Sequence, residues 1–305
     1  MIELLDIKVD VVFKDFFGDK SDKEILESFI NSVLGLKGDD QIEVEEFLDP
    51  RKMRIEVGRP STFVDLSVKS KGGERYLIEM QTYNHEGFDK RLLYYLGKDY
   101  TEQLDYHQDY KNEIQKRKKL INYRDLPKVH IIALVDFHRC GQKKNGILND
   151  NKVVETYRFK PEFSSANEHL FDQWKATILD LKKFEEKPLE EYKTIKELWF
   201  YILKDAPFIK ERELNFLKKE PIFKRALERL ERLSSDPATR KAYEASINEH
   251  RDHLAVLSSE RAEGRAEGHK QKSLEIVQKM LKIKRPIQEI IEVTGLPEED
   301  ILSLL

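Results

Sequence analysis

A hairpin predicted within residues 63–81 restricts the fold of this chain more than any other feature. Residues 63–68 and 76–81 both alternate apolar and polar side chains, and the loop Lys71-Gly72-Gly73 lies between them. This pattern predicts two β-strands joined by a tight turn. A sheet buries both apolar faces together only if even-numbered positions oppose even-numbered ones, which requires an odd number of loop residues. This loop meets the condition, with Gly73 in the left-handed conformation that such loops need.

The predicted register places two acidic side chains next to each other. With even-numbered positions paired across the hairpin, Asp65 lies directly opposite Glu79, and Gln81 shares their face. Like charges directly opposite each other on neighbouring strands destabilise a sheet, so another group must offset the repulsion. Two interpretations stay open. Either water or nearby lysines screen this face, or the two carboxylates and a backbone carbonyl bind a divalent cation.

Further helices and strands are predicted around this hairpin. Apolar residues at helical spacing indicate the helices, and a nearly continuous apolar run indicates a buried strand. The predicted helices are 9–17, 21–35 and about 88–107, and the predicted strands are 129–137, 153–159 and 174–181. A capping box of Ser21 and Glu24 would start the second helix, and Gly35 would end it. Beyond Pro188 the pattern is mainly helical, so the fold class predicted is α/β followed by a helical region.

The C-terminal region is charged and repetitive. Residues 260–268 contain the sequence Arg-Ala-Glu-Gly twice, and because glycine weakens a helix by about 1 kcal/mol relative to alanine, a marginal helix or a linker is predicted there. Two short helices joined at Gly295 are predicted to follow. The second begins with three acidic residues, 298–300, which repel DNA and favour a structural cap or an interaction module. This region could also bring copies of the chain together as a homo-oligomer.

Charge and cysteine content exclude several classes of protein. The chain has 54 Lys and Arg against 57 Asp and Glu, a formal net charge of −3, so a nucleic acid must be held by a local patch. The single cysteine, Cys140, excludes disulfide scaffolds and cysteine-rich zinc sites. No segment has the length and apolarity of a membrane span, and the first residues lack the basic start of a signal peptide. We therefore expect a soluble, cytoplasmic protein without a membrane partner.

Two other polar features each have a structural and a functional interpretation. The basic run at residues 111–119 is typical of a solvated helix face, and contact with phosphate is the alternative. His85 follows the second strand of the hairpin, where it could act as a base. An exposed loop histidine is the simpler interpretation.

Several motifs, taken in order, resemble one known family. Asp65 on one strand and Glu79-Met80-Gln81 on the next resemble the acid and the E-x-K core of the PD-(D/E)-x-K nucleases, with glutamine in place of lysine. More narrowly, the chain resembles the recombination-promoting nuclease and transposase family of this superfamily. The segments that carry this resemblance are 10–18 (DVVFKDFFG), 78–81 (IEMQ), Arg91 with Tyr94-Tyr95, the Arg-Ala-Glu-Gly repeats and 293–297 (VTGLP).

The resemblance implies a restriction-endonuclease-like core, a mixed central sheet flanked by helices, that cuts DNA with a divalent metal. Residues 1–185 would form the nuclease domain, 186–258 a helical region, and 259–305 the repeat linker and the terminal helical hairpin. Mg²⁺ is the usual metal of such nucleases, with another divalent cation such as Mn²⁺ as the alternative.

The resemblance also implies roles for individual residues. Asp65, Glu79 and the backbone carbonyl of Met80 would ligate the metal. Gln81, the third catalytic position, can orient the attacking water through its amide but adds no charge. Asp10 could approach the same metal, or act only as a helix N-cap. Arg91 could bind a substrate phosphate, or form a salt bridge that closes its helix onto the sheet.

Three functions are consistent with these features. The first is a metal-dependent DNA endonuclease associated with recombination or mobile elements. The second is a catalytically silent DNA-binding or self-associating protein in which the acidic pair is a relic. The third is a transposase that carries out strand transfer, which ranks below the nuclease because the widely spaced acids of an RNase H-like transposase cannot be identified.

Overall fold

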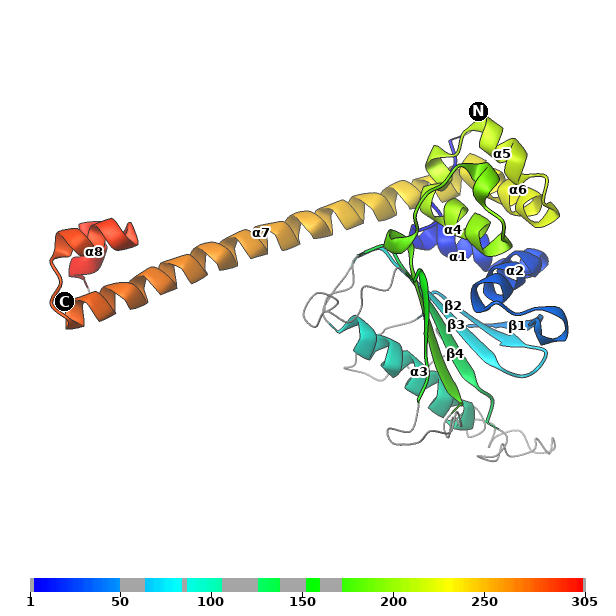
Figure 1. Cartoon of the computed structure of the whole chain (residues 1–305), viewed down its shortest axis with the longest axis horizontal. Coiled ribbons are helices and arrows are strands. Elements are labelled where there is room, and N and C mark those ends of the chain that lie inside the picture. The colour runs from blue at the N-terminus through cyan, green and yellow to red at the C-terminus, as the bar shows by residue number, and fades with distance from the viewer. Residues whose placement is uncertain are drawn as a thin grey trace. The chain divides into compact units, whose positions relative to one another are not determined.

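A computed structural model describes residues 3–49, 64–83, 87–105, 126–137, 152–159 and 172–303. His85, Cys140 and the basic run at 111–119 lie outside these ranges. The chain forms two compact units, Met1–Glu244 and Ala245–Leu305. The first contains a mixed six-stranded sheet with helices on both faces (Figure 1). The predicted α/β class, with helices after the sheet, is therefore confirmed.

The sheet has the strand order β1-β2-β3-β4-β6-β5. Its strands are β1 (Val44–Leu48), β2 (Leu66–Ser70), β3 (Arg75–Gln81), β4 (Val129–Val135), β5 (Val154–Tyr157) and β6 (Trp174–Asp180). Strands β3, β4 and β6 are parallel to one another, and the other pairs are antiparallel. All seven residues of β4 are buried, which explains its continuous apolar sequence. The edge strand β1 was not predicted, because its sequence VEEFL has no alternating pattern.

The β2–β3 hairpin has the predicted register. Leu66 pairs with Ile78 and Val68 with Tyr76, and Gly73 has a φ of 89° in the turn. The predicted first strand is too long, however, because β2 begins only at Leu66. Val64 therefore does not share the apolar face of Leu66. It packs in the cluster on the opposite face of the sheet, since the alternation of side chains is broken before the strand starts.

In the described part of the chain, five helices share one core with one face of the sheet (Figure 1). They are α1 (Asp10–Phe17), α2 (Lys23–Leu34), α4 (Ile195–Asp205), α5 (Glu211–Leu217) and α6 (Pro221–Ser235). Trp199 of α4 lies at the centre of this layer, with ring centroids 5.9 Å from Phe17, 6.0 Å from Phe29 and 5.0 Å from Phe223. These aromatic contacts join the N-terminal helices to the later helical segment in one core.

The start of α2 differs from the prediction. Ser21 does not form a capping box with Glu24. Its backbone N–H and its hydroxyl both donate to Oδ1 of Asp19, at 2.8 and 2.7 Å. Asp19 thus caps a short 3₁₀ turn, Lys20–Asp22, and α2 begins after it at Lys23. The predicted end is confirmed, because Gly35 caps the helix with a φ of 71°.

Helix α3 (Phe88–Asp105) packs on the other face of the sheet (Figure 1). Its buried side chains Leu92, Tyr95 and Leu96 pack with Leu77 of β3 and with Ile131 of β4. Odd-numbered side chains of β3 therefore face α3, whereas even-numbered ones face the five-helix layer. Glu79 and Gln81 consequently point towards α3.

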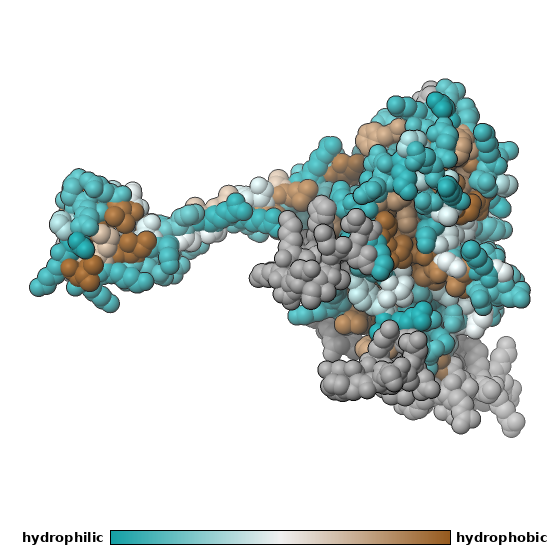
Figure 2. Space-filling model, in the orientation of Figure 1, coloured by the Kyte–Doolittle hydropathy of each residue, from teal (hydrophilic) through white to brown (hydrophobic). Residues whose placement is uncertain are grey.

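The second unit is helical. Helix α7 (Pro237–Lys282) runs into it from the first unit, and α8 (Ile287–Thr294) and α9 (Glu298–Leu302) follow. The repeat segment is helical rather than a linker, and Gly295 ends α8 with a φ of 69° as predicted. Val277, Ile290 and Ile301 form a small core, while the surface of α7 is mostly hydrophilic (Figure 2). Within the described residues, no helix is long and apolar enough to cross a bilayer.

Candidate active site

The predicted acidic pair lies where β2 begins and β3 ends. Asp65 directly precedes β2, and its Oδ2 accepts a hydrogen bond of 2.7 Å from the backbone N–H of Met80. Glu79 lies on the α3 side of β3. Because Asp65 is placed before the strand, its side chain also reaches α1 on the opposite side of the sheet. The carboxylate of Asp65 thus lies between the two helical layers.

The two carboxyls are buried close to each other, and their pKa values reflect this. Burial, together with a hydrogen bond with Asp10, raises the pKa of Asp65 to about 7, against the opposing effects of the Met80 N–H and Lys14. Burial and the charge of Asp65 raise the pKa of Glu79 to about 8, although Arg91 and Lys14 oppose this. The two cations therefore compensate only part of the negative charge at this site.

Arg91 of α3 joins the last two polar residues of β3. Its Nη2 donates to Oε1 of Glu79 at 3.1 Å and to Oε1 of Gln81. The guanidinium carbon lies 6.0 Å from the ring centroid of Phe88 and 5.8 Å from that of Tyr95. The salt bridge that closes α3 onto the sheet, one of the two interpretations of Arg91, is therefore present. Phosphate binding by Arg91 stays a prediction.

The amide of Gln81 is held at both ends. Its Oε1 accepts from Arg91, and its Nε2 donates to the backbone carbonyl of Tyr83 at 3.2 Å. Gln81 adds no charge itself, but the guanidinium of Arg91 places one directly against it. The amide orientation is consequently fixed by its neighbours.

Helix α1 brings Asp10 and Lys14 to the acidic pair. Asp10 is the first residue of the helix and not its N-cap, which is Val9, so the capping interpretation of Asp10 is wrong. Its Oδ1 lies 2.6 Å from Nζ of Lys14, and that same nitrogen lies 3.3 Å from Oδ1 of Asp65. Burial lowers the pKa of the Lys14 ammonium, but Asp10 and Asp65 raise it by more, so it lies above its ordinary value.

Sequence reasoning missed Lys14. The available signal was its position one helical turn after Asp10, which places both side chains on one face of α1. Only the packing of α1 against the start of β2 shows that this face meets the acidic pair. That contact is long-range, and no local pattern indicates it.

The donor atoms at this site fit a hard divalent cation. Oε2 of Glu79 is buried and has no hydrogen-bond partner among the described residues, and Asp65 supplies a second carboxylate. No group of three His, Cys, Asp or Glu side chains in the described ranges could hold a metal by itself. Mg²⁺ is often bound by one or two carboxylates, with water and substrate phosphate completing its shell. Such a metal would be held by Asp65 and Glu79 and completed from outside the protein.

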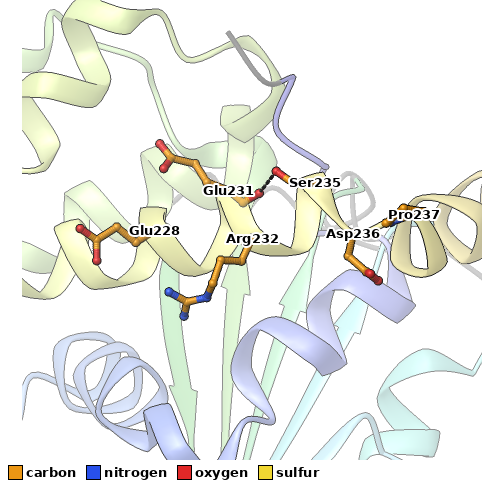
Figure 3. Close-up of a pocket in the computed structure, with 6 residues that line it drawn as sticks. All are labelled: Glu228, Glu231, Arg232, Ser235, Asp236 and Pro237. Atoms are coloured by element: carbon orange, nitrogen blue, oxygen red, sulfur yellow. Dashed lines mark hydrogen bonds between the residues drawn. The ribbon is translucent and has the colours of Figure 1, made fainter.

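A hollow of about 620 Å³ lies away from these residues, between the end of α6 and the start of α7 (Figure 3). It is lined by Glu228, Glu231, Arg232, Ser235, Asp236 and Pro237. Most of its polar groups are already paired within the protein, since Ser235 donates to the carbonyl of Glu231, Asp236 accepts from Thr239, Glu231 pairs with Lys218 and Arg232 pairs with Asp22. This hollow contains none of the predicted site residues and offers no comparable chemistry.

The mixed sheet with flanking helices, with Glu79 on β3 and Asp65 directly before β2, has the architecture expected of the PD-(D/E)XK class. The sequence model of the PD-(D/E)XK nuclease family transposases matches residues 7–260, and the chain belongs to this family. Nucleases of this superfamily generally use divalent cations. The matched range includes the acidic pair, α1 and α3, and it ends before most of the repeat segment. No curated protein and no solved structure matches the chain.

Proposed function

We propose that this protein is a metal-dependent DNA endonuclease that hydrolyses phosphodiester bonds during recombination or the movement of mobile elements. The observation that carries the proposal is the buried pair of Asp65 and Glu79. Its negative charge is only partly compensated, and Oε2 of Glu79 has no hydrogen-bond partner within the described ranges. A pair of carboxylates in this state is suited to a divalent cation. Membership of the family supports DNA as the substrate.

Each site residue has a role in this proposal. Asp65, Glu79 and the carbonyl of Met80 hold the metal, which when bound polarises the phosphate and lowers the pKa of a bound water. Asp10 approaches the same site through Asp65. Gln81, in the position of the superfamily lysine, orients the attacking water with an amide that Arg91 and the carbonyl of Tyr83 hold in place.

The family description favours a second candidate, a transposase. Strand transfer uses the same kind of metal site, with the 3′-hydroxyl of a DNA end in place of water as the nucleophile. A catalytically silent DNA-binding protein is the third candidate, since glutamine replaces the lysine of the superfamily. The three candidates differ in their products: nicked DNA, joined DNA or unchanged DNA.

The deciding experiment is nicking of supercoiled plasmid in Mg²⁺, Mn²⁺ or EDTA. We expect cutting that requires the metal and that falls at least about 100-fold in Asp65→Asn and in Glu79→Gln, since each variant removes a charged ligand but keeps the shape of the side chain. Asp39→Asn, an exposed acid outside the site, serves as the control and should cut as the wild type does. Strand-transfer products with a labelled DNA end would support the transposase, and unchanged DNA under all conditions would support the silent protein. Equal cutting by all variants would place the activity elsewhere or in a contaminant.

A further inference from the structure

Two cations flank the acidic pair, one from each helical layer. Arg91 reaches it from α3, and Lys14 reaches it from α1. The Glu-Met-Gln segment itself has no positive charge, because Gln81 is neutral. An incoming phosphate would meet whichever of these two cations is accessible and free to change partners.

Arg91 already interacts with several other residues of the protein. Its Nη2 is shared between Glu79 and Gln81, its guanidinium lies near two aromatic rings, and its side chain is only 21% exposed. Moving it towards a substrate would break the salt bridge to the buried carboxylate of Glu79. Loss of one partner from a buried ion pair is costly, so Arg91 is best suited to hold α3 and the Gln81 amide in place.

Lys14 differs from Arg91 in its exposure and in its partners. Its side chain is 43% exposed, and among the residues that the structure describes its ammonium pairs with two carboxylates of the site, Asp10 and Asp65. Oδ2 of Asp65 is occupied by the Met80 N–H, whereas Oδ1 faces Lys14. Lys14 therefore marks the accessible side of the acidic pair. Asp10, one turn earlier on α1, holds the ammonium there whatever else binds Asp65.

We propose that Lys14 supplies, from α1, the positive charge that the Glu-x-Gln motif lacks, and that its ammonium contacts the scissile phosphate. Asp10 is the positioning residue for this ammonium. The inference rests on the proposed endonuclease function and deepens it. Charge of this kind acts by stabilising the additional negative charge that develops on the phosphate during an in-line displacement.

The test compares four variants in the plasmid assay. Lys14→Met should reduce Mg²⁺-dependent nicking by about 100-fold or more, and Lys14→Arg should retain more activity because it keeps the charge. Gln81→Lys in the Lys14→Met background should recover at least about tenfold, since it returns a charge to the same site. Lys20→Met, at an exposed lysine just after α1, is the control and should cut normally.

Two further measurements separate a role in cleavage from a structural role. Thermal unfolding should show a folded Lys14→Met protein, and a titration with Mn²⁺ should show binding at least as tight as in the wild type, because a competing cation has been removed from Asp65. Loss of Mn²⁺ binding or of folding in Lys14→Met would overturn the inference. So would normal cutting by Lys14→Met, or a double variant without any recovery. If the wild type itself does not cut under any condition, the proposed function fails and the inference fails with it, an outcome distinct from a failure confined to Lys14.

Discussion

At the scale of single residues, protonation of the acidic pair is linked to folding. The pKa values of Asp65 and Glu79 in the folded protein, about 7 and about 8, lie above their ordinary values of 3.8 and 4.5. The folded protein therefore binds more protons than the unfolded chain between these limits, and its free energy of unfolding falls as pH rises through them. His130 acts in the opposite direction. Burial lowers its pKa to about 3. Its contribution to the free energy of unfolding is therefore lost as the pH falls below 6.5, the ordinary pKa of a histidine.

This linkage predicts how the metal-free protein responds to pH. Between pH 6.5 and 8, where most of the His130 contribution is already present and its remaining change is small, we expect the Tm in EDTA to fall as pH rises, by roughly 2–4 °C for each kcal/mol lost. Asp65→Asn should flatten this slope, because it removes one of the two interacting carboxyls. Mg²⁺ should raise the Tm more at pH 8 than at pH 6.5, since it binds the deprotonated pair. A Tm that is constant or rises over this range would contradict the buried, coupled pair.

The sequence alone was sufficient to predict some features of the hairpin and of the site, but not others. The pairing of Leu66 with Ile78 and of Val68 with Tyr76 followed from alternation alone, because a period of two admits only one register that buries both apolar faces. The position of Lys14 against Asp65 could not be predicted in this way. It depends on how α1 packs on the sheet, and the packing of distant segments has no local signature. Val64 was misassigned for a related reason, since the strand starts only at Leu66.

At the scale of elements, the β2–β3 hairpin depends on the conformation of one glycine. Gly73 has a positive φ of 89°, and a Cβ added there would meet no atom within 4 Å. Gly73→Ala should therefore cost only the backbone strain, about 1–2 kcal/mol. Gly72→Ala is the matched control, because Gly72 lacks a positive φ and its Cβ would meet only the Ser70 hydroxyl at 3.7 Å. Denaturant unfolding of both variants checks this, and equal losses would show that the turn does not require the left-handed conformation.

Helix α1 is held in place by α6 through Arg229. The guanidinium of Arg229 donates to the carbonyl of Phe16 at 2.9 Å and to the carbonyl of Asp15, and it pairs with Asp19. The guanidinium thus caps the C-terminal end of α1, the helix that also contains Asp10 and Lys14. The element that carries the second cation is thus positioned from the later part of the chain.

Arg229→Met should destabilise the protein strongly, by about 3–5 kcal/mol, because the Arg229 side chain is buried and its partners would be left unpaired. Arg232→Met on the same helix is the control. Arg232 pairs with Asp22 at 3.3 Å but is 62% exposed, so we expect a change within about 1 kcal/mol. Chemical denaturation of both variants measures the difference. Similar losses in the two would refute the role of Arg229 in fixing α1.

At the scale of the whole molecule, the chain divides into two units with separate cores. The aromatic core around Trp199 lies entirely within the first unit, and Val277, Ile290 and Ile301 form the core of the second. The helical character of the C-terminal region was predictable from its apolar spacing, but the continuation of α7 through the repeats was not. Each glycine there lowers helix propensity, and neighbouring helix formers such as Ala262 and Ala266 outweigh them.

Deletion of residues 259–305 tests what the second unit contributes. We expect the Tm of the main unfolding transition to stay within about 2 °C of the full-length value, because all residues of the core around Trp199 lie in the first unit. The mass by light scattering tests the predicted homo-oligomer. A smaller assembly after deletion would support association through this region, and an unchanged mass would remove that prediction.

The contact of Arg229 with α1 also affects when the site is completed during synthesis. Residues 10, 14, 65, 79 and 91 leave the ribosome early, since translation proceeds from the N-terminus. The guanidinium that fastens the end of α1 is synthesised long after them. A nascent chain therefore carries both acids and both cations before it can hold them in register. If the proposed function holds, the chain gains the ability to cut DNA only when nearly all of the first unit has emerged.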